Sequence, residues 1–407
     1  MANNNNPQEY NLTEWKTYKI GDLCKISSSK RIFAKEYKDS GIPFYRGKEI
    51  IEKQKGNKIS TELYISQERY DEIKAKHGVP QKDDMLLTSV GTLGIPYIVQ
   101  DEVFYFKDGN LTWFYNFEGL DSKYLYYWFL SPIGKMNIDS KAIGSTQKAL
   151  TIETLSKFEI SLPPLEEQRR IAGILGAIDD KIENNRRINT NLELQAQALY
   201  KQWFVDFEFP NEEGKPYKSS GGKMVDSELG LIPEGWRVQT FGDLIKPQKG
   251  KNITRAQVTI GSVPVVAGGL MPSCYHNTSN THCPVVTISA SGANAGYVKM
   301  YHMPIWAADC SYIDDTISKY VHFAYVFLTY NQTSIYHKQQ GCAQPHIYPS
   351  HLMELQFICP TLDILDKFES WSKKIYKLNF TNIQEIETLA TLRDTLLPKL
   401  MNGEIKL

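Results

Sequence analysis

Residues 162–189 read LPPLEEQRRIAGILGAIDDKIENNRRIN, and this stretch decides the expected fold. The Pro-Pro pair ends the preceding element, and a highly charged helical pattern begins directly after it. Seam residues then follow one another at alternating steps of four and three, the a/d repeat of a coiled-coil helix. At ~1.5 Å per residue, such a helix is roughly 60 Å long. The seam comprises Ile171, Leu175, Ile178, Ile182, Asn185, Asn189, Leu192 and Leu199.

A second copy of this helix is expected at the end of the chain. Residues 357–369, FICPTLDILDKFE, resemble residues 160–172, ISLPPLEEQRRIA, at an offset of 197 positions. Two helices that each carry one seam are expected to pair, and asparagines in a seam cost stability but fix its register. The alternative is that each helix packs on its own half of the chain, although neither half could cover so long a helix. The second seam comprises Phe368, Ile375, Asn382, Ile386, Leu389 and Leu396.

The remaining sequence repeats as well. Trp15 and Trp236 open the similar segments WKTYKIGDL and WRVQTFGDL, at an offset of 221 positions. Later, MLLTSVGTLG from Met85 resembles VVTISASGANAG from Val285, and YLYYWFLS from Tyr124 resembles HFAYVFLT. Each half therefore reads as a strand-rich module, a proline stop and a long helix.

The predicted fold class is α+β, with two mixed α/β modules joined by two long antiparallel coiled-coil helices in a pseudo-twofold internal repeat. A connection rich in Gly, Pro, Ser and charge separates the halves and is expected to be a linker. The predicted boundaries are 1–160 for the first module, 161–209 for the first helix, 210–230 for the linker, 231–360 for the second module and 361–407 for the second helix.

Composition narrows the class of protein. With 46 basic and 46 acidic residues the formal net charge is zero, so a nucleic-acid binder of this kind needs a local basic patch. No apolar run approaches the ~20 residues of a membrane span, and the N-terminus lacks the apolar core of a signal peptide, so a cytoplasmic protein without membrane attachment is expected.

Six cysteines in 407 residues do not make a disulfide scaffold. Cys274, His276, His282 and Cys283 only superficially resemble zinc-ligand spacing, so reduced thiols and no metal are expected. The sequence contains no P-loop, no G-x-G-x-x-G, no H-E-x-x-H and no nucleophile elbow. A chain without a catalytic site of its own is therefore expected. Two alternatives stay open: a coiled-coil scaffold that binds no DNA, and a fused enzyme with an unrecognised site in the Cys/His-rich second half.

Three stretches resemble the DNA-specificity subunit of type I restriction–modification enzymes. Residues 162–189 resemble its central conserved region, and residues 203–236, WFVDFEFPNEEGKPYKSSGGKMVDSELGLIPEGW, resemble its linker into the second recognition domain. Residues 392–407, LRDTLLPKLMNGEIKL, resemble its C-terminal conserved region. The resemblance implies two target-recognition domains, each reading one half of a split double-stranded DNA sequence, and a helix pair that sets the unread spacer.

The resemblance also implies partners. It predicts assembly with two methyltransferase (modification) subunits and, through them, with a restriction/translocase subunit. S-adenosylmethionine, ATP and Mg are expected only on those partners, so no cofactor is expected for this chain. In the second helix Pro360-Thr361-Leu362-Asp363 replaces Pro-Pro-Leu-Glu, so the two docking sites need not be equivalent.

Candidates for DNA contact are polar side chains on loops, because Arg and Lys pair with guanine or phosphate, and Asn and Gln with adenine. Small residues in loops 88–94 and 289–296 would allow close approach to DNA. The alternative for each candidate is a solvated surface residue. The first module offers Lys30, Arg31, Arg46, Lys48, Ser89, Thr92, Gln147 and Lys148. The second offers Lys249, Lys251, Arg255, Ser291, Asn294, Gln340, Gln344 and His346.

Overall fold

The computed structural model describes residues 15–144, 148–341 and 344–407. The chain divides into two compact units: unit 1 is Met1–Asn184 with Glu385–Leu407, and unit 2 is Asn185–Gln384. Each unit combines a mixed module of strands and short helices with part of two long helices, and the predicted α+β fold class is confirmed. In the described part of the chain, no helix is long and apolar enough to cross a membrane.

Unit 1 is built on two small sheets, and a two-stranded ribbon closes its module. The four-stranded sheet is antiparallel, whereas the three-stranded sheet joins one antiparallel and one parallel pair. In order, the first contains β2 (Lys25–Ser27), β8 (Leu111–Tyr115), β5 (Met85–Thr88) and β6 (Pro96–Ile98). The second contains β4 (Tyr64–Ile65), β3 (Ile42–Tyr45) and β7 (Tyr105–Phe106), and the ribbon pairs β1 (Lys16–Lys19) with β9 (Glu159–Leu162).

Helix α3 (Ser122–Leu130) contributes aromatic side chains to the unit 1 core. Asp121 caps it by accepting hydrogen bonds from the backbone N–H groups of Lys123 and Tyr124. Strand β5 is buried along its whole length, and Phe114 of β8 packs edge-on against Phe129 of α3 at 5.8 Å. Helices α4 (Pro132–Lys141) and α5 (Ile152–Ser156) complete the module.

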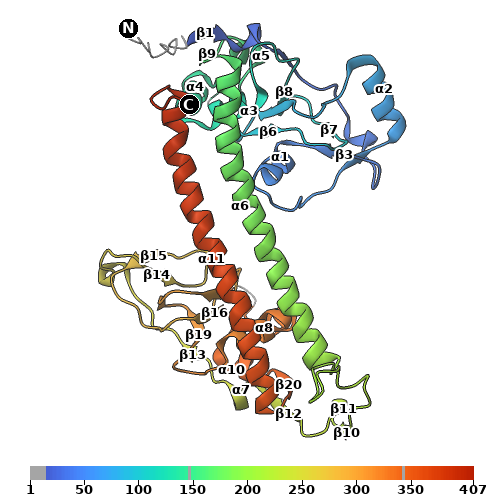
Figure 1. Cartoon of the computed structure of the whole chain (residues 1–407), viewed down its shortest axis with the longest axis vertical. Coiled ribbons are helices and arrows are strands. Elements are labelled where there is room, and N and C mark those ends of the chain that lie inside the picture. The colour runs from blue at the N-terminus through green and yellow to red at the C-terminus, as the bar shows by residue number, and fades with distance from the viewer. Residues whose placement is uncertain (1–14, 145–147, 342–343) are drawn as a thin grey trace, which may run out of the picture. The chain divides into compact units, whose positions relative to one another are not determined.

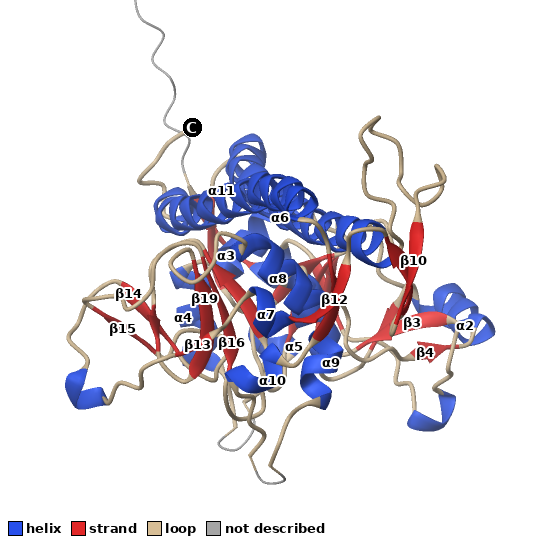
Figure 2. Ribbon diagram, turned by 90° about the horizontal axis from the view of Figure 1, so that it is seen from below, coloured by secondary structure: helices blue, strands red, loops and turns tan. Residues whose placement is uncertain are grey.

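Unit 2 repeats this topology. Three of its sheets have the orders β13-β19-β16-β17, β15-β14-β18 and β12-β20, which match the unit 1 sheets strand for strand. Helix α8 (Val321–Tyr330) takes the place of α3, against β16 and β19 and below the long helices (Figure 2). The strands are β12 (Arg237–Thr240), β13 (Gln248–Lys249), β14 (Val263–Val266), β15 (Cys274–His276), β16 (Val285–Ser289), β17 (Val298–Tyr301), β18 (Trp306–Ala307), β19 (Cys310–Asp314) and β20 (Gln356–Cys359). The short helices are α7 (Phe241–Leu244), α9 (Gln332–His337) and α10 (Pro349–Met353).

One insertion explains why the offset between matching residues of the two modules changes along the chain. The first residues of β3 and β14, Ile42 and Val263, are 221 positions apart, but those of β5 and β16, Met85 and Val285, are only 200 apart. Between these strands unit 1 carries helices α1 (Gly47–Gln54) and α2 (Gln67–His77), which have no helical counterpart between β14 and β16.

The two long helices are α6 (Leu165–Tyr200) and α11 (Leu362–Met401), and both contribute residues to each unit (Figure 1). In unit 1, Asp179 pairs with Arg393 at 2.8 Å and Lys181 pairs with Glu385 at 3.3 Å. In unit 2, Asn189 accepts a hydrogen bond from Asn382 at 2.8 Å. Tyr376 donates to Glu193 there at 3.0 Å. Partners advance along α6 as they recede along α11, so the helices are antiparallel in each unit.

The α6 seam lies largely inward. Ile171, Leu175, Ile182, Asn185 and Leu192 are buried. The remaining members are half-buried: Ile178, Asn189 and Leu199. Helix α6 then continues into a π-helical turn, Lys201–Val205, which places Phe204 in the unit 2 core.

The α11 seam differs from the predicted one. Phe368 and Asn382 are buried. Ile375, Ile386, Leu389 and Leu396 are only half-buried. Tyr376 and Leu397 take the inward positions next to Ile375 and Leu396, because a straight α-helix drifts by ~20° per heptad from a strict heptad repeat.

The connection at 210–230, predicted as a linker, is partly folded. Its residues form β10 (Met224–Ser227), which pairs with β11 (Gly230–Pro233). Tyr217 stacks on Phe209 at 4.6 Å, and Phe209 stacks on Trp236 at 4.8 Å. The prediction of a linker relied on the polar composition of this segment and did not take account of these stacked aromatic residues.

Candidate nucleic-acid interface

In unit 1 the loop after β5 is held by backbone hydrogen bonds. The Ser89 N–H donates to the Asn110 carbonyl at 2.9 Å, and the Ser89 carbonyl accepts from Leu150 at 2.9 Å. The Gly91 N–H donates to Lys148 at 3.1 Å. The Gly94 N–H closes the loop by donating to Thr88 at 2.8 Å. The loop is thereby fixed against the chain before β8 and the chain before α5.

Unit 2 contains the same four bonds. The Ala290 N–H donates to Asp309 at 3.1 Å, and the Ala290 carbonyl accepts from Ile347 at 2.9 Å. The Gly292 N–H donates to Pro345 at 3.0 Å, and the Gly296 N–H donates to Ser289 at 2.7 Å. We call this repeated set of four backbone bonds the loop frame.

A fifth bond extends the equivalence to the end of β3. The Lys107 N–H donates to the Tyr45 carbonyl at 2.8 Å, and in unit 2 the Ala308 N–H donates to the Val266 carbonyl at 2.8 Å. The next residue in each unit, Arg46 or Ala267, therefore occupies the same backbone position beside its loop frame.

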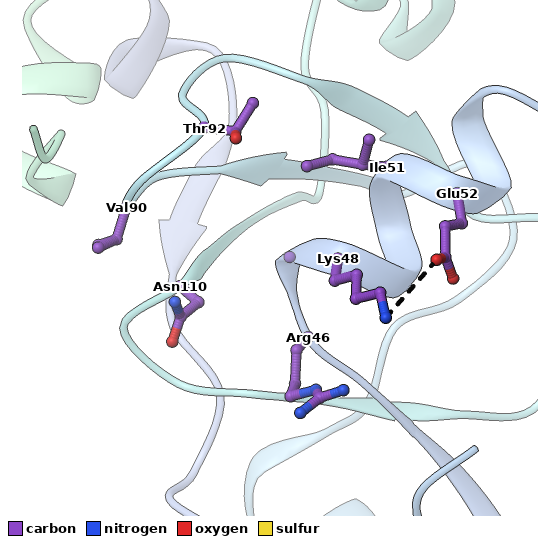
Figure 3. A pocket seen from close by; sticks show the side chains of 8 residues that line it. Arg46, Lys48, Ile51, Glu52, Val90, Thr92 and Asn110 are labelled. Carbon is purple, nitrogen blue, oxygen red and sulfur yellow. Dashed lines mark ion pairs between the residues drawn. The ribbon is translucent and has the colours of Figure 1, made fainter. Parts of the chain in front are cut away.

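A hollow of about 550 Å³ opens at the loop frame of unit 1 (Figure 3). It brings together the start of α1, the loop after β5 and the residue before β8. The predicted candidates Arg46, Lys48 and Thr92 all line it. Its other lining residues are Gly47, Ile51, Glu52, Val90 and Asn110.

Arg46 is held in place by Glu49. The Arg46 guanidinium donates to the two Glu49 carboxylate oxygens, at 2.6 and 3.1 Å, and its backbone N–H donates at 2.8 Å. Burial alone would raise the pKa of Glu49, but the hydrogen bonds from Arg46 lower it, so Glu49 is ionised. The hydrogen bond to Glu49 raises the pKa of Arg46. One third of the Arg46 side chain stays exposed, so this pre-oriented cation can still meet a ligand.

Lys48 is the freer cation of the hollow. Its side chain is 56% exposed, and its Nζ lies 3.0 Å from the Thr61 hydroxyl and 4.0 Å from Glu52. An ammonium on a flexible stem next to a fixed guanidinium suits phosphate contact by the first and base-edge contact by the second.

The other unit 1 candidates are placed unevenly. Lys30, Arg31 and Lys148 are exposed, and Arg31 pairs with Asp108 at 2.8 Å, close in sequence to Asn110. Ser89 is only 3% exposed, so it is not the accessible loop side chain that the sequence predicted. Gln147 lies outside the described residues.

In unit 2 the structure gathers most candidates around the loop frame. Ser291 forms a short hydrogen bond with Asp309. Gln340 and His346 exchange backbone hydrogen bonds at 3.1 and 2.8 Å, and Gln344 is exposed on the same turn. Asn294 is half-buried and its carbonyl accepts from Tyr297.

The basic candidates of unit 2 divide into two groups. Lys249 is exposed on β13, and the Lys251 N–H donates to Ala307 at 2.9 Å, so this segment borders the chain before β19. Arg255 is exposed on a short 3-10 turn, and no described contact brings it to the loop frame.

Sequence reasoning missed Asn110 and Asp309. Both directly precede a strand, β8 or β19, and both receive a frame bond. The two residues are about 200 positions apart, as expected for the internal repeat, and this spacing could have identified them as equivalent positions.

Among its described residues, the Cys/His-rich half shows no cluster of metal-ligating side chains. The His276 ring accepts from the Thr259 N–H at 3.0 Å, Cys274 and Cys283 are free thiols, and burial raises the pKa of Cys310 to about 12. Across the described ranges, no three His, Cys, Asp or Glu side chains come together as a metal site would require.

Comparison with known proteins identifies this architecture. Residues 13–194 match the model of the type I restriction modification DNA specificity domain. The chain is 27% identical to the type I restriction enzyme MjaIX specificity subunit of Methanocaldococcus jannaschii, over 97% of this chain and 94% of that one. It is 24% identical to the HindI specificity subunit of Haemophilus influenzae, over 67% and 74% of the two chains.

A solved structure has the same fold. The type I restriction–modification S subunit from M. genitalium superposes with a TM-score of 0.62 at 19% identity, and covers 97% of this chain and 98% of its own. The likeness to this solved structure concerns the fold, and the domain match and the two curated relatives concern DNA specificity subunits. Residues 13–194 thus carry a type I restriction modification DNA specificity domain, and nearly the whole chain is similar to a curated specificity subunit, which confirms the resemblance and the expectation of a non-catalytic subunit.

Proposed function

We propose that this specificity subunit recognises a bipartite DNA target, with each unit reading one half-site through the side chains around its loop frame. The observation that carries the proposal is the repeated frame itself. Two copies of one backbone arrangement present loops of the same shape, and the frame bonds of the two units agree within 0.2 Å. A repeated DNA-facing scaffold suits two successive readings of one duplex.

The two units present different side chains on this frame. Unit 1 places Arg46, Asn110 and Lys148 where unit 2 places Ala267, Asp309 and Pro345. Guanidinium, amide and ammonium groups favour guanine, adenine and phosphate, whereas a carboxylate accepts from cytosine. Two different half-sites are therefore expected.

The long helices are proposed to set the spacer and to dock partners. Both α6 and α11 contribute residues to each unit, so their length fixes how many base pairs lie between the half-sites. Leu194 and Leu378 are 63% and 47% exposed on these helices, which suits a surface that another subunit covers. The proposed partners are two methyltransferase subunits and, through them, a restriction/translocase subunit. S-adenosylmethionine, ATP and Mg are assigned to those subunits.

Module exchange tests the bipartite model. Residues 15–160 are replaced by the matching module of a relative, and the assembled complex is examined by methylome sequencing. One half of the methylated sequence should change while the other half and the spacer length persist. The matched control exchanges residues 237–359 and should change the opposite half. A change in both halves, or in neither, would contradict the model. Methyl transfer by the isolated chain would contradict the assignment of cofactors.

A further inference from the structure

The loop after β14, residues 267–272 with the sequence AGGLMP, is called the tip loop here. It occupies the backbone position that Arg46 and the start of α1 occupy in unit 1, where they line the hollow. Instead of cations, the tip loop presents two neighbouring apolar side chains. Leu270 is 49% exposed and Met271 is 72% exposed.

The tip loop is fastened directly to the loop frame of unit 2. The Ser289 hydroxyl donates to the Gly268 carbonyl at 3.1 Å. A Cβ at Gly268 would lie 2.6 Å from the Ser291 carbonyl oxygen, so only glycine permits this approach. On the other side, the Lys299 ammonium donates to the Leu270 carbonyl at 3.2 Å and sits over the Tyr301 ring at 5.0 Å.

These contacts hold Leu270 and Met271 outward before any ligand arrives. A loop fixed in its binding conformation loses less conformational entropy on association. The only apolar group that a base pair displays on its major-groove edge is the 5-methyl group of thymine. Leu270 and Met271 form an ordered apolar pair at the position where unit 1 places cations proposed to contact DNA. This pair is suited to contact the thymine methyl group.

We infer that the tip loop is a specificity determinant of the half-site read by unit 2, in which Leu270 and Met271 contact thymine 5-methyl groups. The inference rests on the proposed bipartite function and assigns the chemistry of one half-site. It predicts that this half-site contains thymine on at least one strand at a position where the methyl group contributes to binding.

Base substitution tests this directly. Once methylome sequencing has given the motif, the full chain assembled with its methyltransferase partner is titrated with duplexes in which each thymine of that half-site is replaced in turn by deoxyuridine. Removal of one contacted methyl group should weaken binding about fourfold, the equivalent of ~0.8 kcal/mol for one buried methyl-sized group. Deoxyuridine in the half-site read by unit 1 removes no methyl group that the tip loop contacts.

Variants locate the effect in the protein. The substitutions Leu270→Ala and Met271→Ala together should weaken binding to the thymine duplex and abolish the deoxyuridine penalty. The control is Ile260→Ala, because Ile260 is 95% exposed on the chain before β14, at the other end of that strand. It should leave both affinity and penalty unchanged.

The outcomes separate the two proposals. A bipartite motif whose unit 2 half-site lacks thymine, or a deoxyuridine penalty that persists in the double variant, overturns the inference and leaves the bipartite function standing. A methylated motif that is not bipartite overturns the proposed function, and the inference falls with it.

Discussion

Tyr127 on α3 donates a 2.7 Å hydrogen bond to the Asp179 carboxylate on α6, and this bond ties the unit 1 module to its long helix. The Arg393 guanidinium of α11 occupies the other carboxylate oxygen at 2.8 Å. At the matching position of the repeat, Tyr325 of α8 lies 3.5 Å from Glu193, which also accepts from Tyr376. Each unit thus anchors its module helix to the helix pair through a tyrosine and a carboxylate.

The substitution Tyr127→Phe should lower the free energy of unfolding by ~1–2 kcal/mol, because it removes a hydrogen bond to a charged, partly buried acceptor. Thermal unfolding of the variant measures this. The control is Tyr126→Phe, since the hydroxyl of Tyr126 lies 3.5 Å from Gln54 and its bond is correspondingly weak. Equal losses for the two variants would show that the Asp179 anchor contributes no particular stability.

The asparagine pair in unit 2 should show non-additive stability. Asn382 donates to the side-chain carbonyl of Asn189 at 2.8 Å, and Asn189 donates to the Asn379 carbonyl at 3.2 Å. Asn382→Leu alone should cost ~1–3 kcal/mol, because it leaves the Asn189 side-chain carbonyl without this donor between the two helices. Adding Asn189→Leu should recover much of that loss. Chemical denaturation of both single variants and the double variant measures the coupling; additive losses would contradict it.

Arg46→Ala should weaken binding of the cognate duplex by ~1–3 kcal/mol and relax the preference at one position of the unit 1 half-site. The reason is the fixed guanidinium, which Glu49 holds toward the hollow. Lys48→Gln offers a contrast, since a phosphate contact should weaken all sequences alike and reduce the salt dependence by about one counterion. Competition binding at several salt concentrations separates the two signatures. Lys157→Gln, on the chain directly after α5, should change neither.

Acid should destabilise unit 2 through His302. Burial, and secondarily the charge of His322, lower the pKa of His302 to about 4, and its ring stacks on Phe380 at 4.8 Å. Above its ordinary pKa of ~6.5 the ring is neutral in both states, so nothing is lost. Between that value and about 4, the unfolded chain binds a proton that the folded chain excludes, so stability falls as pH falls.

The variant His302→Gln should therefore show a smaller decrease in unfolding midpoint between pH 7 and pH 5. The exposed His337 on α9 offers the matched control, and His337→Gln should keep the wild-type slope. Identical slopes for all three proteins would mean that His302 protonates equally in both states.

Much of the architecture was predictable because it follows from periodic or repeated sequence. The α6 seam depends on spacing alone, and the module repeat depends on pairs such as Trp15 and Trp236. The short parallel pairing of β3 with β7 has no local signal, since it joins two residues on each strand. The burial of Tyr376 was equally unpredictable from the spacing, because a helix that departs from a strict heptad repeat buries residues adjacent to the predicted seam positions.

The candidate site was predictable as segments but not as side chains. Loops 88–94 and 289–296 are held against the segments before β8 and α5 and before β19 and α10, respectively, and the close approach to Ser291 is permitted by Gly268, which lies outside both loops. The prediction that the Ser89 side chain is accessible was wrong, because backbone hydrogen bonds to Asn110 and Leu150 hold this residue inside the loop. Residue types in the sequence do not indicate which backbone atoms form such bonds.

The loop frame separates shape from chemistry. Every bond in it joins main-chain atoms, so substitutions at the non-glycine positions of these loops can leave the loop geometry intact while they change the groups proposed to face DNA, whereas Gly91, Gly94, Gly292 and Gly296 have positive φ angles that favour glycine. Such a surface tolerates variation at its contact positions without loss of folding, and variation in one unit leaves the frame of the other untouched. Under the proposed bipartite function, a new target half could arise by a few point substitutions on an unaltered scaffold, and the combinations available to the whole subunit would multiply across its two units.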